Sequence, residues 1–211
     1  ADIVAGYTTY IRIIEKSFTL KNVFVTGMRS ETERCRKALE FALDGKTVAL
    51  VSSGDAGIYG MAGLMLEVIR DSGEDVETEV VPGITSASAS AALLGAPLMH
   101  DYASISLSDL LTDADLISRR IEAAASADFV ICLYNPKSRA RTGGLAKARE
   151  IILKHRKGST PVGIVRNANR EDESVVITDL DRMLEHEADM TTTIIIGNSQ
   201  TFTYRDKIIT P

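Results

Sequence analysis

The sequence predicts an α/β protein of two domains, in which a parallel sheet comes first and a mixed sheet follows. Short apolar runs alternate with amphipathic stretches along the chain, as in strands joined by crossover helices. The 211 residues equal about 1.4 domains of ordinary size, so one large or two small domains are both compatible with the length. The pattern changes after Pro97, and we therefore place a linker at 98–102, between domains 1–98 and 102–211.

The first domain shows apolar runs typical of strands, at 3–5, 23–25, 47–51 and 76–81. Amphipathic patterns predict helices over 31–43, 58–70 and 85–94. The clearest helix begins with Ser30 and Glu33, which are spaced as a capping box, and Gly45 follows as its terminator. Gly73 ends the second helix in the same way.

The second domain shows further apolar runs, at 103–107, 129–134, 162–166, 175–178 and 192–196. Helical patterns occupy 113–125, 145–156 and 180–187. Too few residues separate 162–166 from 175–178 for a crossover helix, so we expect these two strands to pair antiparallel. The second sheet is therefore predicted to be mixed.

Composition excludes several classes of protein. A net charge of −5 disfavours nucleic acid as a partner, and no apolar run is long enough for a membrane span. The chain has only two cysteines, Cys35 and Cys132, which suits a reducing cytoplasm and no disulfide framework. The three histidines lie far apart in sequence, so we expect no metal site.

Glycine-rich and small residues follow two strands of the first domain, where open parallel sheets bind ligands. The segment 52–60 fits neither the dinucleotide fingerprint nor the Walker loop. Asp55 within it is interpreted equally well as a helix cap or as a partner for a ribose hydroxyl or an ammonium group. Thr85 and Ser86 follow the next strand and are natural caps.

Strand ends in the second domain carry polar and basic groups. Lys137, Arg139 and Arg141 place three cations within five residues, either as a solvated loop or as a receptor for a carboxylate-rich substrate. The segments 166–170 and 196–199 also come at predicted strand ends.

Together these segments resemble the tetrapyrrole methylases, and within them the precorrin-3B C17-methyltransferase branch of cobalamin biosynthesis. The resemblance covers essentially the whole chain. It rests on SSGDAGIYGMA at 52–62, LGAPLMHD at 94–101, ISLSDLLT at 105–112 and LYNP at 133–136.

The resemblance implies that S-adenosylmethionine lies folded in a cleft between the two domains, contacted largely by backbone groups at strand ends. The residues that match the family's cofactor site are Gly54, Asp55, Ile58, Thr85, Ser86, Tyr134, Asn135, Asn167, Ala168, Gly197, Asn198 and Ser199. A homodimer is also implied.

The substrate that the resemblance implies is a polycarboxylate corrinoid precursor, methylated at C17 as its macrocycle contracts. Lys137, Arg139 and Arg141 would then pair with its propionate and acetate groups. Alignment supplies much of the rate of such a methyl transfer, so no dedicated base is required. Ring contraction needs proton movements, for which Tyr59, His100 and Asp101 are candidates.

One departure concerns the start of the chain. Members of the family begin with a strand, a Gly-x-Gly-Pro-Gly loop and a helix, and this sequence starts after that unit. We therefore expect about thirty further residues upstream in the natural polypeptide. The alternatives are a sibling methylase acting at another carbon, a superfamily member acting on protein or RNA, and a non-catalytic nucleotide-binding module.

Overall fold

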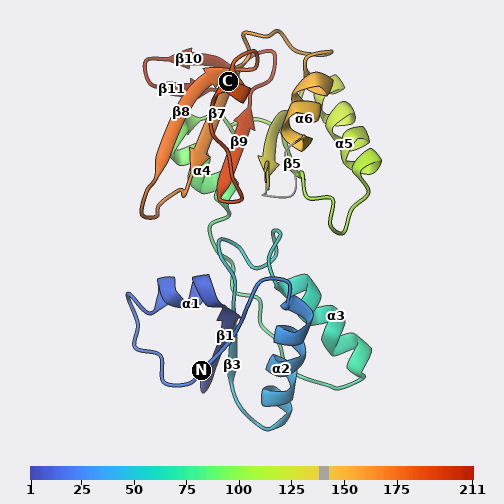
Figure 1. The fold of residues 1–211 in the computed structure, drawn as a ribbon, viewed down its shortest axis with the longest axis vertical. Helices are drawn as coiled ribbons and strands as arrows, with labels where there is room; N and C mark the ends of the chain where they lie inside the picture. The colour runs from blue at the N-terminus through green and yellow to red at the C-terminus, as the bar shows by residue number, and fades with distance from the viewer. Residues whose placement is uncertain (138–142) are drawn as a thin grey trace. The chain divides into compact units, whose positions relative to one another are not determined.

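The computed structural model describes residues 1–137 and 143–211, and its α/β architecture confirms the predicted fold class (Figure 1). Contacts divide the chain into two compact units, Ala1–Thr85 and Ser86–Pro211. This division lies before the predicted linker at 98–102, because helix α4 (Ser86–Leu94) packs on the second sheet. Ala87 and Leu94 of that helix are buried against strands of the second unit.

The first unit contains a parallel sheet of three strands. Strand β1 (Ile3–Tyr7) lies between β2 (Val23–Thr26) and β3 (Val48–Val51), and parallel pairing joins it to both. The carboxyl ends of the three strands therefore share one edge. Three helices accompany this sheet, namely α1 (Thr8–Ile14), α2 (Glu31–Leu43) and α3 (Ala62–Ser72).

The predicted boundaries of α2 are confirmed, although its capping box does not form. The Ser30 side chain makes no capping hydrogen bond, and the Glu31 carboxylate instead accepts one from the Arg29 amide at 3.3 Å. The helix predicted at 58–70 begins only at Ala62. Tyr59 has a left-handed backbone with φ of 53°, which a helix cannot include.

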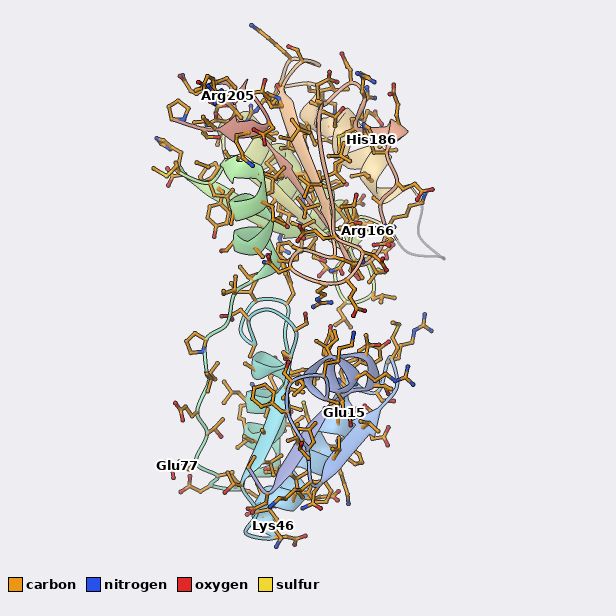
Figure 2. All side chains as sticks on the ribbon, turned by 90° about the vertical axis from the view of Figure 1, so that its left-hand side faces the viewer. Glu15, Lys46, Glu77, Arg166, His186 and Arg205 are labelled. Atoms are coloured by element: carbon orange, nitrogen blue, oxygen red, sulfur yellow. The ribbon has the colours of Figure 1, made fainter. Side chains whose placement is uncertain are left out.

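No strand forms at 76–81, where an apolar run predicts one. Val80 and Val81 are exposed to 46% and 68%, and Figure 2 labels Glu77 on the same segment. A strand requires a hydrogen-bonded neighbour, and β3, at the edge of the sheet, pairs only with β1 among the described strands. An apolar run alone carries no information about such a neighbour.

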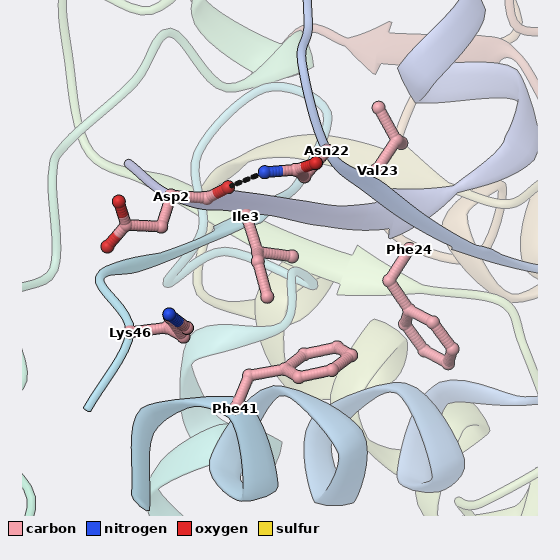
Figure 3. Close-up of a pocket in the computed structure, with 7 residues that line it drawn as sticks. All are labelled: Asp2, Ile3, Asn22, Val23, Phe24, Phe41 and Lys46. Atoms are coloured by element: carbon pink, nitrogen blue, oxygen red, sulfur yellow. Dashed lines mark hydrogen bonds between the residues drawn. The ribbon is translucent and has the colours of Figure 1, made fainter. Parts of the chain in front are cut away.

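Aromatic packing joins β2 to α2 at the amino end of the first sheet. The rings of Phe24 and Phe41 meet edge to face, with centroids 5.8 Å apart (Figure 3). They line a hollow of about 370 Å³ with Asp2 and Lys46, and the Asn22 amide donates to the Asp2 carbonyl at 3.0 Å. This hollow lies away from the strand ends at which the candidate residues gather.

The second unit contains a mixed sheet of five strands, which confirms the prediction. Its order is β5 (Tyr102–Ser106), β6 (Val130–Tyr134), β9 (Thr192–Ile196), β7 (Pro161–Arg166) and β8 (Ser174–Asp179). Strands β5 and β6 are parallel, whereas β9 runs antiparallel to both β6 and β7. The expected antiparallel pair of β7 and β8 is present.

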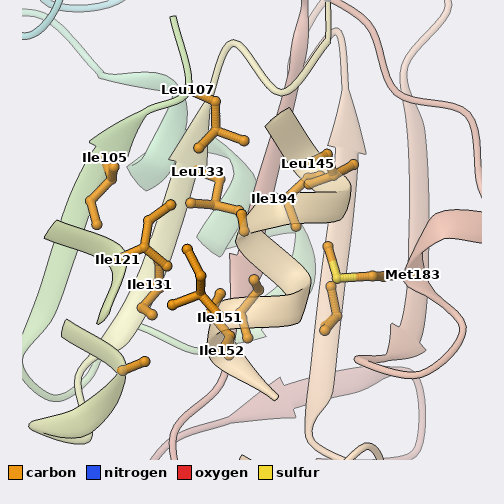
Figure 4. Close-up of a cluster of buried hydrophobic side chains, with 14 of the residues drawn as sticks. Ile105, Leu107, Ile121, Ile131, Leu133, Leu145, Ile151, Ile152, Met183 and Ile194 are labelled. Atoms are coloured by element: carbon orange, nitrogen blue, oxygen red, sulfur yellow. The ribbon is translucent and has the colours of Figure 1, made fainter. Parts of the chain in front are cut away.

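Helices cover both faces of this sheet. Alternate side chains of β6 enter two clusters. Ile131 and Leu133 face α5 (Ala114–Ser126) and α6 (Gly144–Ile152), as Figure 4 shows. Val130 and Cys132 face α4. Cys132 and Cys35 are core residues, and burial raises the pKa of their thiols to about 12 and about 11.

Small elements complete the second unit. Strands β10 (Phe202–Tyr204), β11 (Lys207–Ile209) and β4 (Gly95–Ala96) form a separate sheet that the sequence pattern does not predict. The helix predicted at 180–187 is only a 3-10 turn, η1 (Met183–Glu185). Among the described residues, no helix is long and apolar enough to cross a bilayer.

Candidate functional site

The loop after β3 lies at the carboxyl edge of the first sheet, and Asp55 organises it. One carboxylate oxygen accepts the Gly57 amide at 2.7 Å, and the other accepts the Gly83 amide at 2.9 Å. The hydrogen bond from Gly83, followed by that from Gly57, holds the pKa of Asp55 below its usual range. Asp55 therefore positions two loops rather than capping a helix, because α3 begins only at Ala62, and its role toward a ligand stays a prediction.

These two loops pack backbone against backbone. A Cβ atom on Gly83 would lie 2.1 Å from the Gly54 carbonyl oxygen, so only glycine fits at residue 83. Gly54 itself has a left-handed φ of 72°. Ile58 and Tyr59 are exposed to 41% and 55% beside this backbone surface, whereas Thr85 is buried. The arrangement offers a ligand accessible backbone and one apolar side chain.

Sequence reasoning missed Arg34, a buried guanidinium at the same edge. Its Nε donates at 2.8 Å to the hydroxyl of Thr26, the last residue of β2. An Nη donates at 3.1 Å to the carbonyl of Gly27, the next residue. A second Nη contacts the Met61 sulfur at 3.6 Å. Arg34 thus ties the ends of β2 and the loop after β3 together. The available signal was a cation next to Cys35 on the buried face of α2.

The carboxyl ends of β5, β6 and β7 share one edge of the second sheet. The Asn135 amide donates to the Ser106 hydroxyl at 2.9 Å, which joins the ends of β6 and β5. Asn135 and Asn167 both have left-handed backbones, with φ of 52° and 53°, and turn the chain away from β6 and β7. The structure therefore brings these two candidates, with Ala168, to the same edge.

Tyr134 and Ser86 have structural partners at this edge. The buried Tyr134 hydroxyl accepts the Ala87 amide at 2.9 Å, near the start of α4. Ser86 accepts a hydrogen bond from the Thr193 hydroxyl at 3.0 Å. Both side chains therefore dock α4 onto the sheet. A direct role in cofactor binding stays a prediction for each.

Arg166 ends β7 at the same edge; it belongs to the predicted strand-end segment 166–170 but was assigned to neither cofactor nor substrate. Figure 2 labels it at the margin of the second unit, and its Nε is buried without a hydrogen-bond partner. Nearby, the Asp189 carboxylate accepts the Thr191 amide at 2.8 Å and the Thr192 hydroxyl at 3.1 Å. The signal for Arg166 was a cation terminating an otherwise apolar strand.

Residues 197–199, which the family resemblance assigns to the cofactor site, lie at the other edge of this sheet, and their role toward the cofactor stays a prediction. Strand β9 runs antiparallel to β6 and β7, so its carboxyl end lies at the opposite edge of the sheet. There the Ser199 hydroxyl donates to Asp128 at 2.6 Å, and Asn198 accepts the Gln200 amide at 3.0 Å. Gly197 fits because a Cβ would lie 2.5 Å from Thr201. These residues shape a turn, away from Asn135 and Asn167.

His100 and Asp101 also lie at that opposite edge, just before β5 begins. Their side chains are 62% and 82% exposed and 3.8 Å apart. They line a hollow of about 530 Å³ with Asp128 and Asn198. The structure therefore does not bring these two acid–base candidates together with the candidates at the carboxyl edge of their own sheet, whereas Tyr59 does lie in a carboxyl-edge loop.

The basic loop after β6 is only partly described. Lys137 is exposed, and Arg139 and Arg141 fall within 138–142, outside the described residues. No group of His, Cys, Asp and Glu side chains within 1–137 and 143–211 is arranged to hold a metal ion.

Comparison with known proteins places this geometry in a family. Residues 1–184 match the family described as Tetrapyrrole (Corrin/Porphyrin) Methylases. The chain is 51% identical to the cobalt-factor III methyltransferase of Priestia megaterium, covering all of this chain and 40% of that protein. It is 50% identical to the probable cobalt-factor III C(17)-methyltransferase of Salmonella typhimurium, covering all of this chain and 88% of that protein.

Solved structures agree with these relatives. The methyltransferase CobJ superposes with a TM-score of 0.91 at 30% identity, over all of this chain and 89% of that chain. The cobalt precorrin-4 methyltransferase CbiF shares the fold, with a TM-score of 0.72 at 23% identity over 93% of this chain and 84% of that chain. The chain spans less than half of the Priestia relative and most of the Salmonella relative. The chain belongs to the tetrapyrrole methylase family, in the branch of the cobalt-factor III C17-methyltransferases.

Proposed function

We propose that this chain transfers a methyl group from S-adenosylmethionine to C17 of cobalt-factor III, with contraction of the macrocycle, in cobalamin biosynthesis. The observation that carries the proposal is the 51% identity, over the whole chain, to the cobalt-factor III methyltransferase of Priestia megaterium. The names of this and the Salmonella relative favour the cobalt-containing substrate over metal-free precorrin-3B.

The residues at the strand ends suit the proposed methyl donor. The loop after β3 exposes Gly54 and Gly57, so backbone groups rather than a basic side chain would meet a ligand there. Such a surface fits hydroxyl, amino and adenine groups better than phosphates, which prefer the Walker loop that this chain lacks. When bound, S-adenosylmethionine supplies an electrophilic methyl group, whose bonding electrons remain on the sulfur as it leaves.

The proposed cofactor contacts fall into two groups. Gly54, Ile58, Asn135, Asn167 and Ala168 lie at carboxyl edges and would contact the donor directly. The remaining candidates at these edges, Asp55, Thr85, Ser86 and Tyr134, would act mainly by holding those loops in place. This division follows from the partners or burial of the second group, because a satisfied or buried side chain gains less from a ligand. Asn135, whose side-chain amide already donates to Ser106, would contact the donor through its backbone.

Protons moved during ring contraction require a titratable group near the macrocycle. Among the three candidates we favour Tyr59, because it lies in a carboxyl-edge loop with its side chain 55% exposed. Lys137 with Arg139 and Arg141 would meet the acidic side chains of the substrate.

The same proposal includes a cytoplasmic homodimer that binds neither nucleic acid nor membrane. Its support is the net charge of −5, the two buried free cysteines and the family resemblance. Sedimentation of the purified protein would test the dimer directly.

Two measurements test the function. Calorimetry should detect binding of S-adenosylmethionine and S-adenosylhomocysteine, and absence of binding at millimolar ligand would refute a methyltransferase. Mass spectrometry of a reaction with cobalt-factor III should show a product one methyl heavier. A gain of methyl only on another tetrapyrrole would favour a sibling enzyme, and cofactor binding without any transfer would favour a binding module.

A further inference from the structure

The second unit presents a guanidinium without a partner at the carboxyl end of β7. Arg166 is half-buried, and its Nε is fully buried with no hydrogen-bond partner. Within residues 1–137 and 143–211, no hydrogen bond or ion pair engages its side chain. A buried, unsatisfied donor is costly to a folded protein, and most such groups are paired in native structures.

Other buried arginines of this unit differ from Arg166. Arg149 donates to the Leu180 carbonyl at 2.6 Å and to the Asp181 carbonyl at 2.8 Å. Arg156 donates to the Ala125 carbonyl at 2.7 Å and pairs with Asp128 at 3.0 Å. The Nε of Arg156 is also buried without a partner, but both of its Nη groups are engaged inside the fold. The guanidinium of Arg166 has no such contact among the described residues and is available to a ligand.

The charge of Arg166 acts on Asp189, but no ion pair joins the two among the described residues. Both threonines of the turn before β9 donate to one oxygen of Asp189, at 2.7 Å from the Thr191 hydroxyl and 3.1 Å from the Thr192 hydroxyl. Burial raises the pKa of Asp189, but these hydrogen bonds and the charge of Arg166 together lower it below its usual range. Asp189 stays ionised and acts on Arg166 only through space.

Arg166 lies at the same sheet edge as Asn135, one of the candidate donor residues. Arg166 pairs with Thr192 across the ladder, and Leu133 of β6 pairs with Ile194 of the same strand. Arg166 and Asn135 consequently lie at one edge of the sheet, on either side of the start of β9. Side chains two residues apart share a face, so Arg166 follows Ile164 on the face that α5 and α6 cover.

We propose that Arg166 binds a carboxylate of one of the two reactants, an assignment that rests on the proposed function. A guanidinium pairs with a carboxylate through two parallel N–H donors, which would satisfy the buried Nε. The carboxylate belongs either to the methionine part of the donor or to an acetate or propionate group of the macrocycle. Arg166 would then determine affinity for that reactant.

Paired ligands distinguish the two sources. S-adenosylhomocysteine carries the amino-acid carboxylate, and 5′-methylthioadenosine lacks it. Cobyrinic acid carries the free acids of a corrinoid, and dicyanocobinamide lacks them. Calorimetry of the full chain with all four ligands would compare the wild type with Arg166→Met, Arg166→Lys and Arg120→Met, the last removing a charge from the exposed surface of α5.

We expect Arg166→Met to lower the affinity for one of the two carboxylate ligands by about ten- to hundredfold, as for loss of hydrogen bonds from a charged donor. Its carboxylate-free counterpart should bind as before, Arg166→Lys should lose less affinity, and Arg120→Met should match the wild type. Thermal stability of Arg166→Met should be equal or higher, because the substitution removes a buried unsatisfied group. A purely structural Arg166 would instead lower stability.

Three results would overturn the assignment. If Arg166→Met binds all four ligands with wild-type affinity, the inference fails while the proposed function stands. If the wild type binds neither S-adenosylhomocysteine nor cobyrinic acid, the proposed function fails and the inference fails with it. Equal losses for a ligand and its carboxylate-free counterpart would also contradict a carboxylate receptor.

Discussion

Replacement of Gly83 by alanine should separate the two loops at the carboxyl edge of the first sheet. The new Cβ would lie 2.1 Å from the Gly54 oxygen, where ordinary contacts begin at 3.4 Å, so the backbones must move apart by roughly 1 Å. The hydrogen bond of 2.9 Å between the Gly83 amide and Asp55 would then be lost. We expect a cost of about 1–3 kcal/mol in the free energy of unfolding, as for other overpacked sites.

The assay combines thermal unfolding with calorimetry. A chain of this size should lose about 2–4 °C in melting temperature per kcal/mol, and affinity for S-adenosylhomocysteine should fall with the displaced loop. Gly63→Ala is the matched control, since nothing lies within 4 Å of its added Cβ and alanine favours helix α3. Unchanged melting temperature and cofactor affinity in Gly83→Ala would refute the packing argument.

Three further predictions concern single side chains. Asp55→Ala should weaken S-adenosylhomocysteine binding, because it loosens the same two loops. Asp55→Asn keeps one acceptor and should weaken binding less. Wild-type affinity in both variants would show that Asp55 has no influence on cofactor binding. Tyr134→Phe should cost about 1 kcal/mol in denaturant unfolding, because the buried Ala87 amide loses its acceptor; no cost would mean that another group replaces the hydroxyl. Asp128 has a lowered pKa, since the hydrogen bonds from Ser199 and the charge of Arg156 outweigh the effect of burial. The stability from Asp128 should therefore be present above its unfolded pKa of about 3.9 and decline as the pH falls through the lower folded value, and Asp128→Asn should remove this acid-dependent part of the unfolding curve.

Strand direction decides which residues at strand ends share an edge of the second sheet. Asn135 and Asn167 follow β6 and β7, which run in the same direction, so they reach one edge. Gly197 follows an equally apolar strand, but β9 is antiparallel to both. Strand direction depends on pairing with segments far away in sequence, and a local apolar run does not specify it.

Local chemistry and long-range packing also explain the other differences. The boundaries of α2 could be predicted because apolar spacing and a terminating glycine are local features. Burial of Arg34 could not, because its partners at Thr26 and Met61 come together only in the folded sheet. Likewise, the lack of a partner for the Nε of Arg166 among the described residues depends on packing between segments that are far apart in sequence.

The backbone amides of strand β6 can report unfolding of the second unit, because all five residues of the strand are buried and it lies between β5 and β9 in the sheet. Amides in such a strand exchange with deuterium only when the whole unit opens, so their rates report its global free energy of unfolding. Strand β1 is central in the first sheet but only partly buried. Exchange measured in β1 and β6 with and without S-adenosylhomocysteine would therefore reveal whether the two units open independently and whether the ligand couples them.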